Sequence, residues 1–223
     1  MFATNYLATR LSLGAEATPD KVFATRPGLP DVTYAQLFTG AQQIAQRLLG
    51  AGLHPGDRVA VQVDKTLEAV QLYIGTVLAG GIFLPLNTAY TGPEVAYFLS
   101  DATPAIVACD PARLAEITPL AGAATLFTLD KSGHGSLTDD LPAADPGFQP
   151  VPRDGSDLAA ILYTSGTTGR SKGAMLSHAN LASNSETLRD LWQFTDQDVL
   201  IHALPIFHTH GLFVATNVAL LAG

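Results

Sequence analysis

The chain has 223 residues, of which 47% are hydrophobic and 14% are charged. This composition supplies a sizeable core for one large domain or two small ones, which argues against wholesale disorder. The net charge is −8 and the basic residues are scattered, so we expect neither a nucleic-acid partner nor attraction to an anionic membrane.

Apolar periodicity and turn residues predict alternating helices and strands. Thr33 is the predicted N-cap of the first helix, and Pro111 is expected to open a helix at its first position. This alternation predicts an α/β fold with mainly parallel sheets flanked by helices. In chain order, the other predicted elements are a helix over 35–49, a strand over 58–63, a helix over 67–78, a strand over 82–84, a helix over 93–99, strands over 105–109, 124–129, 158–163 and 173–176, a helix over 178–191, a strand over 199–203 and a helix over 212–221.

Two stretches fall outside this alternation. Residues 130–157 are rich in Gly, Pro, Ser and Asp, which predicts a surface loop or linker. The last predicted helix, 212–221, is apolar and needs a surface to bury against. We therefore expect the chain to be a piece of a larger protein, and we expect its exposed apolar edge to favour self-association.

The ends and the cysteine content indicate a cellular location. Residues 1–17 lack the basic start and continuous apolar core of a secretory signal, and no apolar run approaches the ~18 residues of a membrane span. Cys109 has no second cysteine to pair with, and its apolar surroundings over 105–109 predict a buried strand residue. These features favour a cytoplasmic protein with no membrane partner.

A segment rich in glycine and hydroxyl groups, 163–173, follows the apolar strand 158–163. Its glycines permit backbone conformations that can direct several N–H groups at one anion. Lys172 adds a positive charge able to reach a phosphate. The segment therefore predicts a triphosphate-binding loop. The predicted binding residues are Thr164, Ser165, Gly166, Thr167, Thr168, Gly169 and Lys172.

This loop does not match other phosphate-binding patterns. A Walker A loop places its lysine directly after a glycine and before Ser or Thr, whereas Lys172 precedes Gly173. The dinucleotide-binding GxGxxG pattern is also absent here. The plain structural alternative is a flexible, hydroxyl-rich hairpin.

The segment 163–173 resembles the signature loop of the adenylate-forming superfamily, which includes acyl-CoA synthetases. Segments 78–87, 174–181 and 204–211 are similar to further motifs of that superfamily, and they occur in the same order. Within it, 85–91 and 202–215 look like bacterial malonyl-CoA synthetases. The resemblance implies that residues 1–223 form an incomplete N-terminal domain, and that the C-terminal domain is absent from the sequence.

The resemblance also implies chemistry. Such enzymes join a carboxylate to ATP, release pyrophosphate, and pass the acyl group to coenzyme A. The expected ligands are therefore ATP, Mg²⁺, coenzyme A and a small carboxylate such as malonate. Thr164 would be a metal-side hydroxyl, and His208 would be the catalytic residue beside the reacting carboxylate and the α-phosphate. A strand ending at residue 203 would bring His208 to the edge of the sheet, where sites form.

Several alternatives remain at this stage. His210 could be functional or structural, His202 is expected to be structural, and Arg170 is expected to be solvated or close to phosphate. The chain could instead belong to a CoA ligase for another carboxylic acid. It could also be a non-catalytic or degenerate nucleotide-binding fragment. If it is part of a synthetase, we expect the 223-residue chain alone to be inactive.

Overall fold

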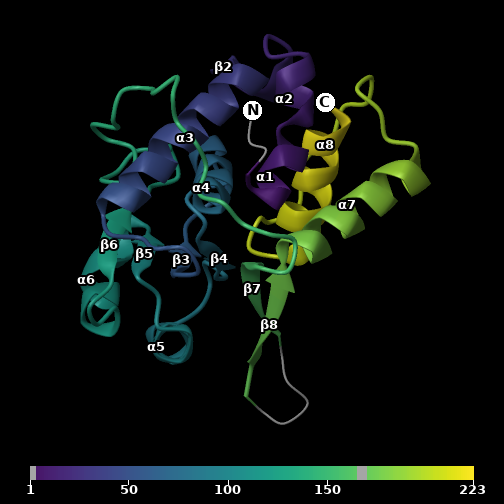
Figure 1. The fold of residues 1–223 in the computed structure, drawn as a ribbon. Helices are drawn as coiled ribbons and strands as arrows, with labels where there is room; N and C mark the ends of the chain where they lie inside the picture. Colours follow the sequence, from purple (N-terminus) through teal and green to yellow (C-terminus); the bar gives the residue numbers. More distant parts are fainter. Residues whose placement is uncertain (1–3, 165–169) are drawn as a thin grey trace.

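The computed structural model describes residues 4–164 and 170–223. Within them, a six-stranded sheet has the order β6–β5–β3–β4–β7–β8 (Figure 1). In this described sheet, neighbouring strands are parallel except for the antiparallel pair β7–β8, so the predicted mainly parallel sheet is confirmed. The strands are β3 (Arg58–Gln62), β4 (Ile82–Pro85), β5 (Ile106–Cys109), β6 (Thr125–Thr128), β7 (Leu158–Thr164) and β8 (Lys172–Ser177).

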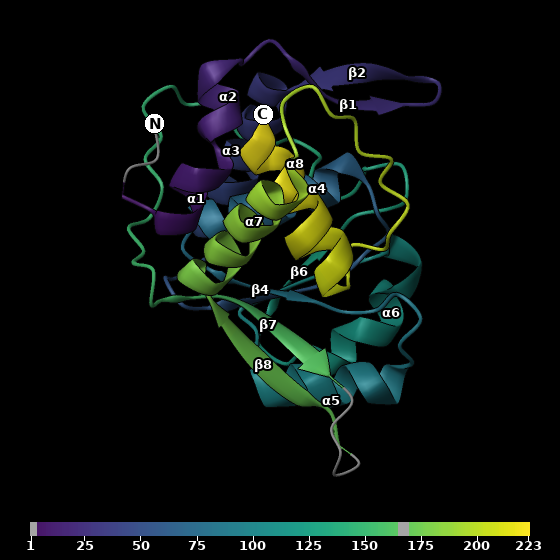
Figure 2. The same cartoon turned by 90° about the vertical axis from the view of Figure 1, so that its right-hand side faces the viewer.

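Helices cover both faces of the sheet (Figures 1 and 2). Successive side chains of a strand point to opposite faces. Val59 and Val61 therefore join the core beneath the larger helical layer, whereas Ala60 joins the core beneath α5 and α6. The larger layer contains α1 (Tyr6–Leu11), α2 (Leu13–Ala17), α3 (Tyr34–Gly50), α4 (Leu67–Leu78), α7 (His178–Trp192) and α8 (Asn217–Ala222); the smaller contains α5 (Gly92–Ala102) and α6 (Leu114–Ile117), which 3₁₀ turns flank at Pro111–Arg113 and Thr118–Leu120.

Local sequence signals explain where the main helices begin. The Thr33 hydroxyl accepts from the backbone N–H of Gln36, whose side chain accepts in turn from the N–H of Thr33. This reciprocal pair satisfies two N–H groups that the first turn of α3 leaves without partners. Thr66 caps α4 and Ser177 caps α7 with their hydroxyl groups. Among the described residues, no helix is long and apolar enough to cross a bilayer.

The chain reverses its direction across the sheet at β3. From β3 it passes through α4 to β4 on one side, and from β4 through α5 to β5 on the other side of β3. The two connecting helices lie on opposite faces, because α4 belongs to one core and α5 to the other. A crevice therefore opens at the carboxyl ends of β3 and β4, where ligands bind in open α/β sheets.

The segment 130–157 contains no helix or strand within the described residues, but it is firmly attached to the helices. Leu137 is fully buried in the core. Arg47 of α3 donates to the carbonyls of Ser136 and Asp139, and the N–H of Val151 donates to the last residue of α4. The segment thus packs along α3 and α4 instead of hanging free between two bodies.

The prediction of a strand over 199–203 is wrong. Val199 is 90% exposed and Ile201 is 89% exposed, and no strand of the described sheet pairs with this stretch. Apolar residues favour a strand only where one face can be buried, and here they face solvent. The predicted helix 212–221 begins instead as a π-helix, His210–Thr216, which continues into α8.

A small ribbon was not predicted. It is formed by β1 (Val22–Arg26) and β2 (Leu29–Thr33), which pair antiparallel around Gly28. No residue of either strand is fully buried and β2 contains Pro30, so the alternation of apolar and polar residues that marks a half-buried strand is weak.

Candidate functional site

The crevice at the carboxyl ends of β3 and β4 forms a pocket of about 260 Å³. The side chain of Gln62 donates to the carbonyls of Asn87 (2.9 Å) and Tyr90 (3.3 Å), and this fixes the turn after β4 beside the end of β3. The remaining wall comes from a distant part of the chain. The lining residues are Val63, Asp64, Lys65, Thr88, Ala203, Pro205, Ile206 and Phe207.

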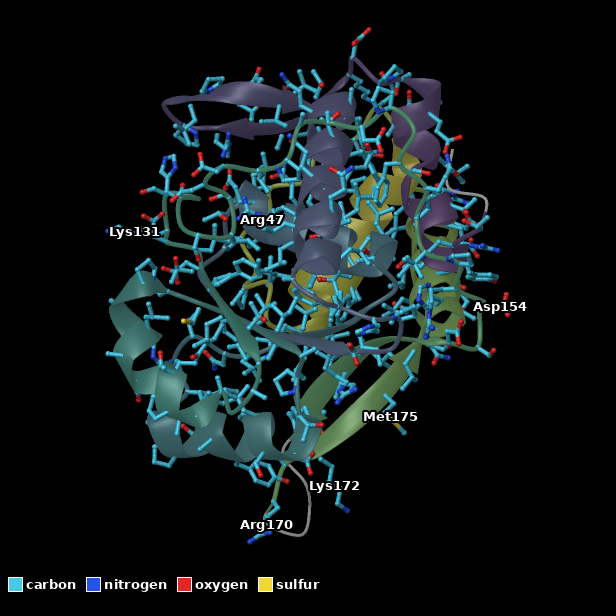
Figure 3. The ribbon with its side chains drawn as sticks, turned by 60° about the vertical axis from the view of Figure 1, so that its left-hand side comes forward. Arg47, Lys131, Asp154, Arg170, Lys172 and Met175 are labelled. Atoms are coloured by element: carbon cyan, nitrogen blue, oxygen red, sulfur yellow. The ribbon has the colours of Figure 1, made fainter. Side chains whose placement is uncertain are left out.

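The predicted phosphate loop joins β7 to β8. Thr164 ends β7 and Lys172 begins β8, and the two are directly opposite in the antiparallel register. Both side chains are exposed, and Figure 3 shows Lys172 and Arg170 at the far end of this hairpin, away from the larger helical layer. The other predicted phosphate ligands lie outside the described residues; these are Ser165, Gly166, Thr167, Thr168 and Gly169.

Helix α5 braces the end of this hairpin that adjoins the loop. The hydroxyl of Tyr97 donates to the carbonyl of Ser171 (2.8 Å), and the hydroxyl of Tyr163 donates to Asp101 (2.5 Å). The rings of Phe98 and Tyr163 lie 4.5 Å apart. Burial, then the hydrogen bond to Asp101, raises the pKa of Tyr163, so its hydroxyl stays protonated and keeps donating. The two ends of the loop are therefore held by α5 as well as by strand pairing.

His208 lies in the segment 202–211, which runs over the crevice and is irregular until the π-helix begins at His210. Its ring is exposed and lies 4.6 Å from the ring of Phe207. A second hollow of about 430 Å³ is lined by Leu204, Pro205, His208, His210 and Gly211. The predicted strand end before His208 is wrong, because residues 199–203 form no strand. The segment reaches the sheet edge by side-chain contacts instead.

Those contacts involve Lys65, His202 and Gly211. Lys65 donates to the carbonyls of His202 (2.8 Å) and Leu204 (3.0 Å). The Nε2 atom of His202 lies 2.9 Å from the carbonyl oxygen of Gly211, so His202 links the two ends of the segment. A Cβ atom on Gly211 would lie only 2.0 Å from the carbonyl oxygen of Pro205, so this position has room for glycine alone.

The structure brings some of the predicted residues together. Thr164 and Lys172 face each other across the hairpin, whereas no hydrogen bond joins His208 to either of them in the described residues. Among residues 4–164 and 170–223, no group of three or more His, Cys, Asp or Glu side chains is arranged to hold a metal ion. Thr164 can offer one hydroxyl oxygen, and a metal there would need the oxygens of a bound phosphate as well.

The sequence profile described as "AMP-binding enzyme" matches residues 12–223. The chain belongs to this family. As a member of the AMP-binding enzymes, it is 32% identical to the oxalate–CoA ligase of Arabidopsis thaliana over 94% of its own length. The match covers 42% of that ligase, so the chain spans less than half of the relative.

Solved AMP-binding enzymes have the same fold. Apo MatB from Rhodopseudomonas palustris superposes with a TM-score of 0.92 at 53% identity, over 98% of this chain and 44% of MatB. The ATP-bound form of MatB superposes with a TM-score of 0.93 at 54% identity, over the same shares of the two chains. The chain corresponds to the N-terminal portion of that enzyme, which confirms the predicted fold.

Three residues with clear structural roles at the site were missed by the sequence analysis: Lys65, Tyr97 and Gly211. Lys65 could have been noticed, since it lies two residues after the predicted strand 58–63, at the end of the sheet where ligands bind. The contacts of Tyr97 and Gly211 depend on the path of distant backbone, and nothing local in the sequence reveals that path.

Proposed function

We propose that the protein containing this chain is an AMP-forming acid–thiol ligase that converts malonate, ATP and coenzyme A to malonyl-CoA, AMP and pyrophosphate. One observation carries the proposal: Thr164 and Lys172 stand opposite each other at the mouth of a hydroxyl-rich loop in an AMP-binding enzyme. The 54% identity to an ATP-bound enzyme, MatB, supports ATP as the nucleotide.

The first step brings a carboxylate to a polyanion, so it requires positive charge and N–H donors around the phosphates. A carboxylate oxygen attacks the α-phosphorus, and the bond from that phosphorus to pyrophosphate breaks. Lys172 and the loop 164–172 would hold the departing phosphates. Mg²⁺ bound with the nucleotide would neutralise phosphate charge, and Thr164 offers it a hydroxyl oxygen.

His208 would stabilise the negative charge that develops between the carboxylate and the α-phosphate. In the second step the sulfur of coenzyme A forms the thioester bond, AMP leaves with the electron pair, and the thiol proton passes to solvent. His210 lines the same hollow as His208, so it is close enough to assist there. His202 bridges parts of its own segment, which favours a structural role.

The identity of the acid is the finer part of the proposal. The 53% identity to MatB and the malonyl-CoA synthetase-like segments 85–91 and 202–215 support malonate. Oxalate–CoA ligase, at 32% identity, shows that relatives with similar sequences are named for other short dicarboxylic acids. A CoA ligase for another carboxylic acid is therefore the second candidate.

The test is ATP–pyrophosphate exchange by the full-length protein with a panel of carboxylic acids. Exchange that is fastest with malonate supports the proposal, and exchange that is fastest with another acid reassigns the substrate. No exchange with any acid would overturn the proposal in favour of a non-catalytic nucleotide-binding protein.

The 223-residue chain alone should neither catalyse this reaction nor stay monomeric. It spans 44% of MatB, and it exposes large apolar side chains such as Trp192 (54%), Val199 (90%) and Ile201 (89%). AMP formation by the purified chain, or a monomer at every concentration in gel filtration, would contradict these two expectations. The buried single cysteine Cys109 supports a reducing location such as the cytoplasm.

A further inference from the structure

Lys65 connects two parts of the chain that are far apart in the sequence. It lies in the turn between β3 and α4, directly before Thr66, the N-cap of α4. Its ammonium group donates to two carbonyl oxygens of the segment 202–211, those of His202 and Leu204. Among the described residues, no other hydrogen bond reaches these two carbonyls. The contact thus joins the carboxyl end of β3 to the segment that carries His208.

The segment has few other anchors before residue 206. Val199, Ile201 and Leu204 are exposed, and Ile206 is the first apolar side chain to enter the core. The Nε2 atom of His202 lies 2.9 Å from the carbonyl oxygen of Gly211 and 3.1 Å from the hydroxyl of Thr216, so His202 ties the segment to the π-helix but not to the sheet. Hydrogen bonds from a charged donor are roughly twice as strong as neutral ones, and Lys65 is the residue that links this end of the segment to the carboxyl end of β3.

We infer that Lys65 is a positioning residue, which fixes the segment 202–211 and thereby sets where His208 stands relative to the crevice. The contacts of Lys65 are independent of function, whereas the consequence for catalysis rests on the role proposed for His208. A misplacement of about 1 Å in a catalytic group can reduce a rate by roughly 100-fold. We call the two hydrogen bonds from Lys65 to the carbonyls of His202 and Leu204 the clamp. Loss of the clamp should slow the first reaction step without weakening the binding of ATP.

The test compares Lys65→Met with Lys65→Arg in the full-length protein, by ATP–pyrophosphate exchange with malonate. Methionine keeps the length of the side chain and removes its donors, whereas arginine keeps donors. We expect Lys65→Met to lower kcat roughly 10- to 100-fold, with less than about a 2-fold change in KM for either substrate. Lys65→Arg should restore most of the rate. Lys131→Met is the matched control, because Lys131 is an exposed lysine that does not line the crevice and whose side chain has no hydrogen bond or ion pair in the described residues (labelled in Figure 3).

A double variant tests whether Lys65 acts through His208. In a His208→Ala background, Lys65→Met should cause little further loss, because the residue that it positions is already gone. A full, multiplicative loss in that background would overturn the inference. A raised KM for malonate with unchanged kcat would overturn it too, since Lys65 would then bind the substrate itself.

Amide hydrogen exchange of the full-length protein tests the clamp without any reaction. Lys65→Met should speed exchange over residues 199–211, and Lys131→Met should leave it unchanged. Unchanged protection in Lys65→Met would overturn the clamp. Amide exchange separates the proposed clamp from the proposed ligase function, because it can be measured even if the protein catalyses no ATP–pyrophosphate exchange with any acid.

Discussion

At the scale of single residues, the proposed phosphate contacts come from opposite strands of one hairpin. Thr164 and Lys172 are register partners, so backbone pairing fixes the distance between the points where their side chains begin. Strand register is a strong restraint, because a slip by one residue would turn each side chain to the other face. The ends of the loop are therefore set before a nucleotide arrives.

Replacing Lys172 with methionine should impair the use of ATP. A hydrogen bond to a charged group contributes about 1.5–3 kcal/mol, which corresponds to roughly a 10- to 100-fold loss in kcat/KM for ATP. Pyrophosphate exchange by the full-length protein measures this loss, with Lys131→Met as the control of equal charge. Wild-type kcat/KM in Lys172→Met would remove the main support for the phosphate loop.

Gly211 limits how closely the segment 202–211 can fold. In Gly211→Ala the new methyl group would overlap the carbonyl of Pro205, which lies 2.0 Å from the Cβ position, so the backbone must shift. Forced overpacking costs about 1–3 kcal/mol. Urea unfolding should show a loss of this size, whereas Gly50→Ala should be near neutral, because nothing lies within 4 Å of its Cβ position. Equal stabilities of the two variants would contradict the close approach.

At the scale of elements, helix α5 and the hairpin β7–β8 act together. The hairpin forms one edge of the sheet (Figure 2), so in the described sheet it pairs with a neighbouring strand on one side alone, through β7 and β4. The aromatic contacts of Tyr97, Phe98 and Tyr163 supply the second support. A brace of this kind would reduce the entropy lost when the loop closes on a ligand.

Removing one hydroxyl tests this brace. Tyr97→Phe loses the hydrogen bond to Ser171, worth about 1 kcal/mol, and should raise KM for ATP a few-fold in the full-length protein. Tyr90→Phe is the matched control, because its ring packs on Phe98 (4.9 Å) while its hydroxyl makes no hydrogen bond within the described residues. If both variants bind ATP equally well, α5 does not position the loop.

The sequence predicted most elements because their burial follows their periodicity. For α4, the predicted range 67–78 is the observed range, and the Thr33 cap and the strands of the sheet were likewise found. The strand prediction for 199–203 failed because this segment has the apolar residues of a strand but no neighbour that could bury them. The ribbon β1–β2 was missed because its burial is only partial: Phe23, Ala24 and Val32 pack against the core, but no residue of either strand is fully buried.

The candidate site was predictable only in part. The loop 163–173 is recognisable because its chemistry is concentrated in neighbouring residues. The surroundings of His208 depend on contacts between residues more than 130 positions apart, such as Lys65 with His202 and Leu204. Such pairs leave no local pattern in the sequence, and they become visible only when the strands bring both partners to one edge of the sheet.

At the scale of the whole molecule, His178 joins helix α7 to the distant helix α1. It begins α7 and is fully buried, and its Nδ1 atom accepts from the N–H of Leu7 in α1 (3.3 Å). Its Nε2 atom is buried without a hydrogen-bond partner in the described residues. Burial, then the positive charge of Arg153, lowers the pKa of His178 to about 4, so the folded protein holds this ring neutral.

The stability of the fold should therefore depend on pH. A histidine has an unfolded pKa near 6.5, and the folded value is about 4, so the unfolded state takes up the proton first as pH falls. Stability from this group is complete above about pH 6.5 and is lost at up to about 1.4 kcal/mol per pH unit on the way to pH 4. Urea midpoints at pH 7 and pH 5 should differ more in the wild type than in His178→Gln. Equal differences would assign the pH dependence to other groups.

The attachment of α1 also has a consequence during protein synthesis. Helix α1 is held by the backbone of Arg153, by His178 and by packing on α7 and α8, all of which leave the ribosome long after α1 does. At roughly 5–20 residues per second, the apolar side of α1 waits on the order of ten seconds for its partners. The nascent chain therefore exposes the apolar side of α1 for that time, and a ribosome-bound chaperone has an interval in which to bind it.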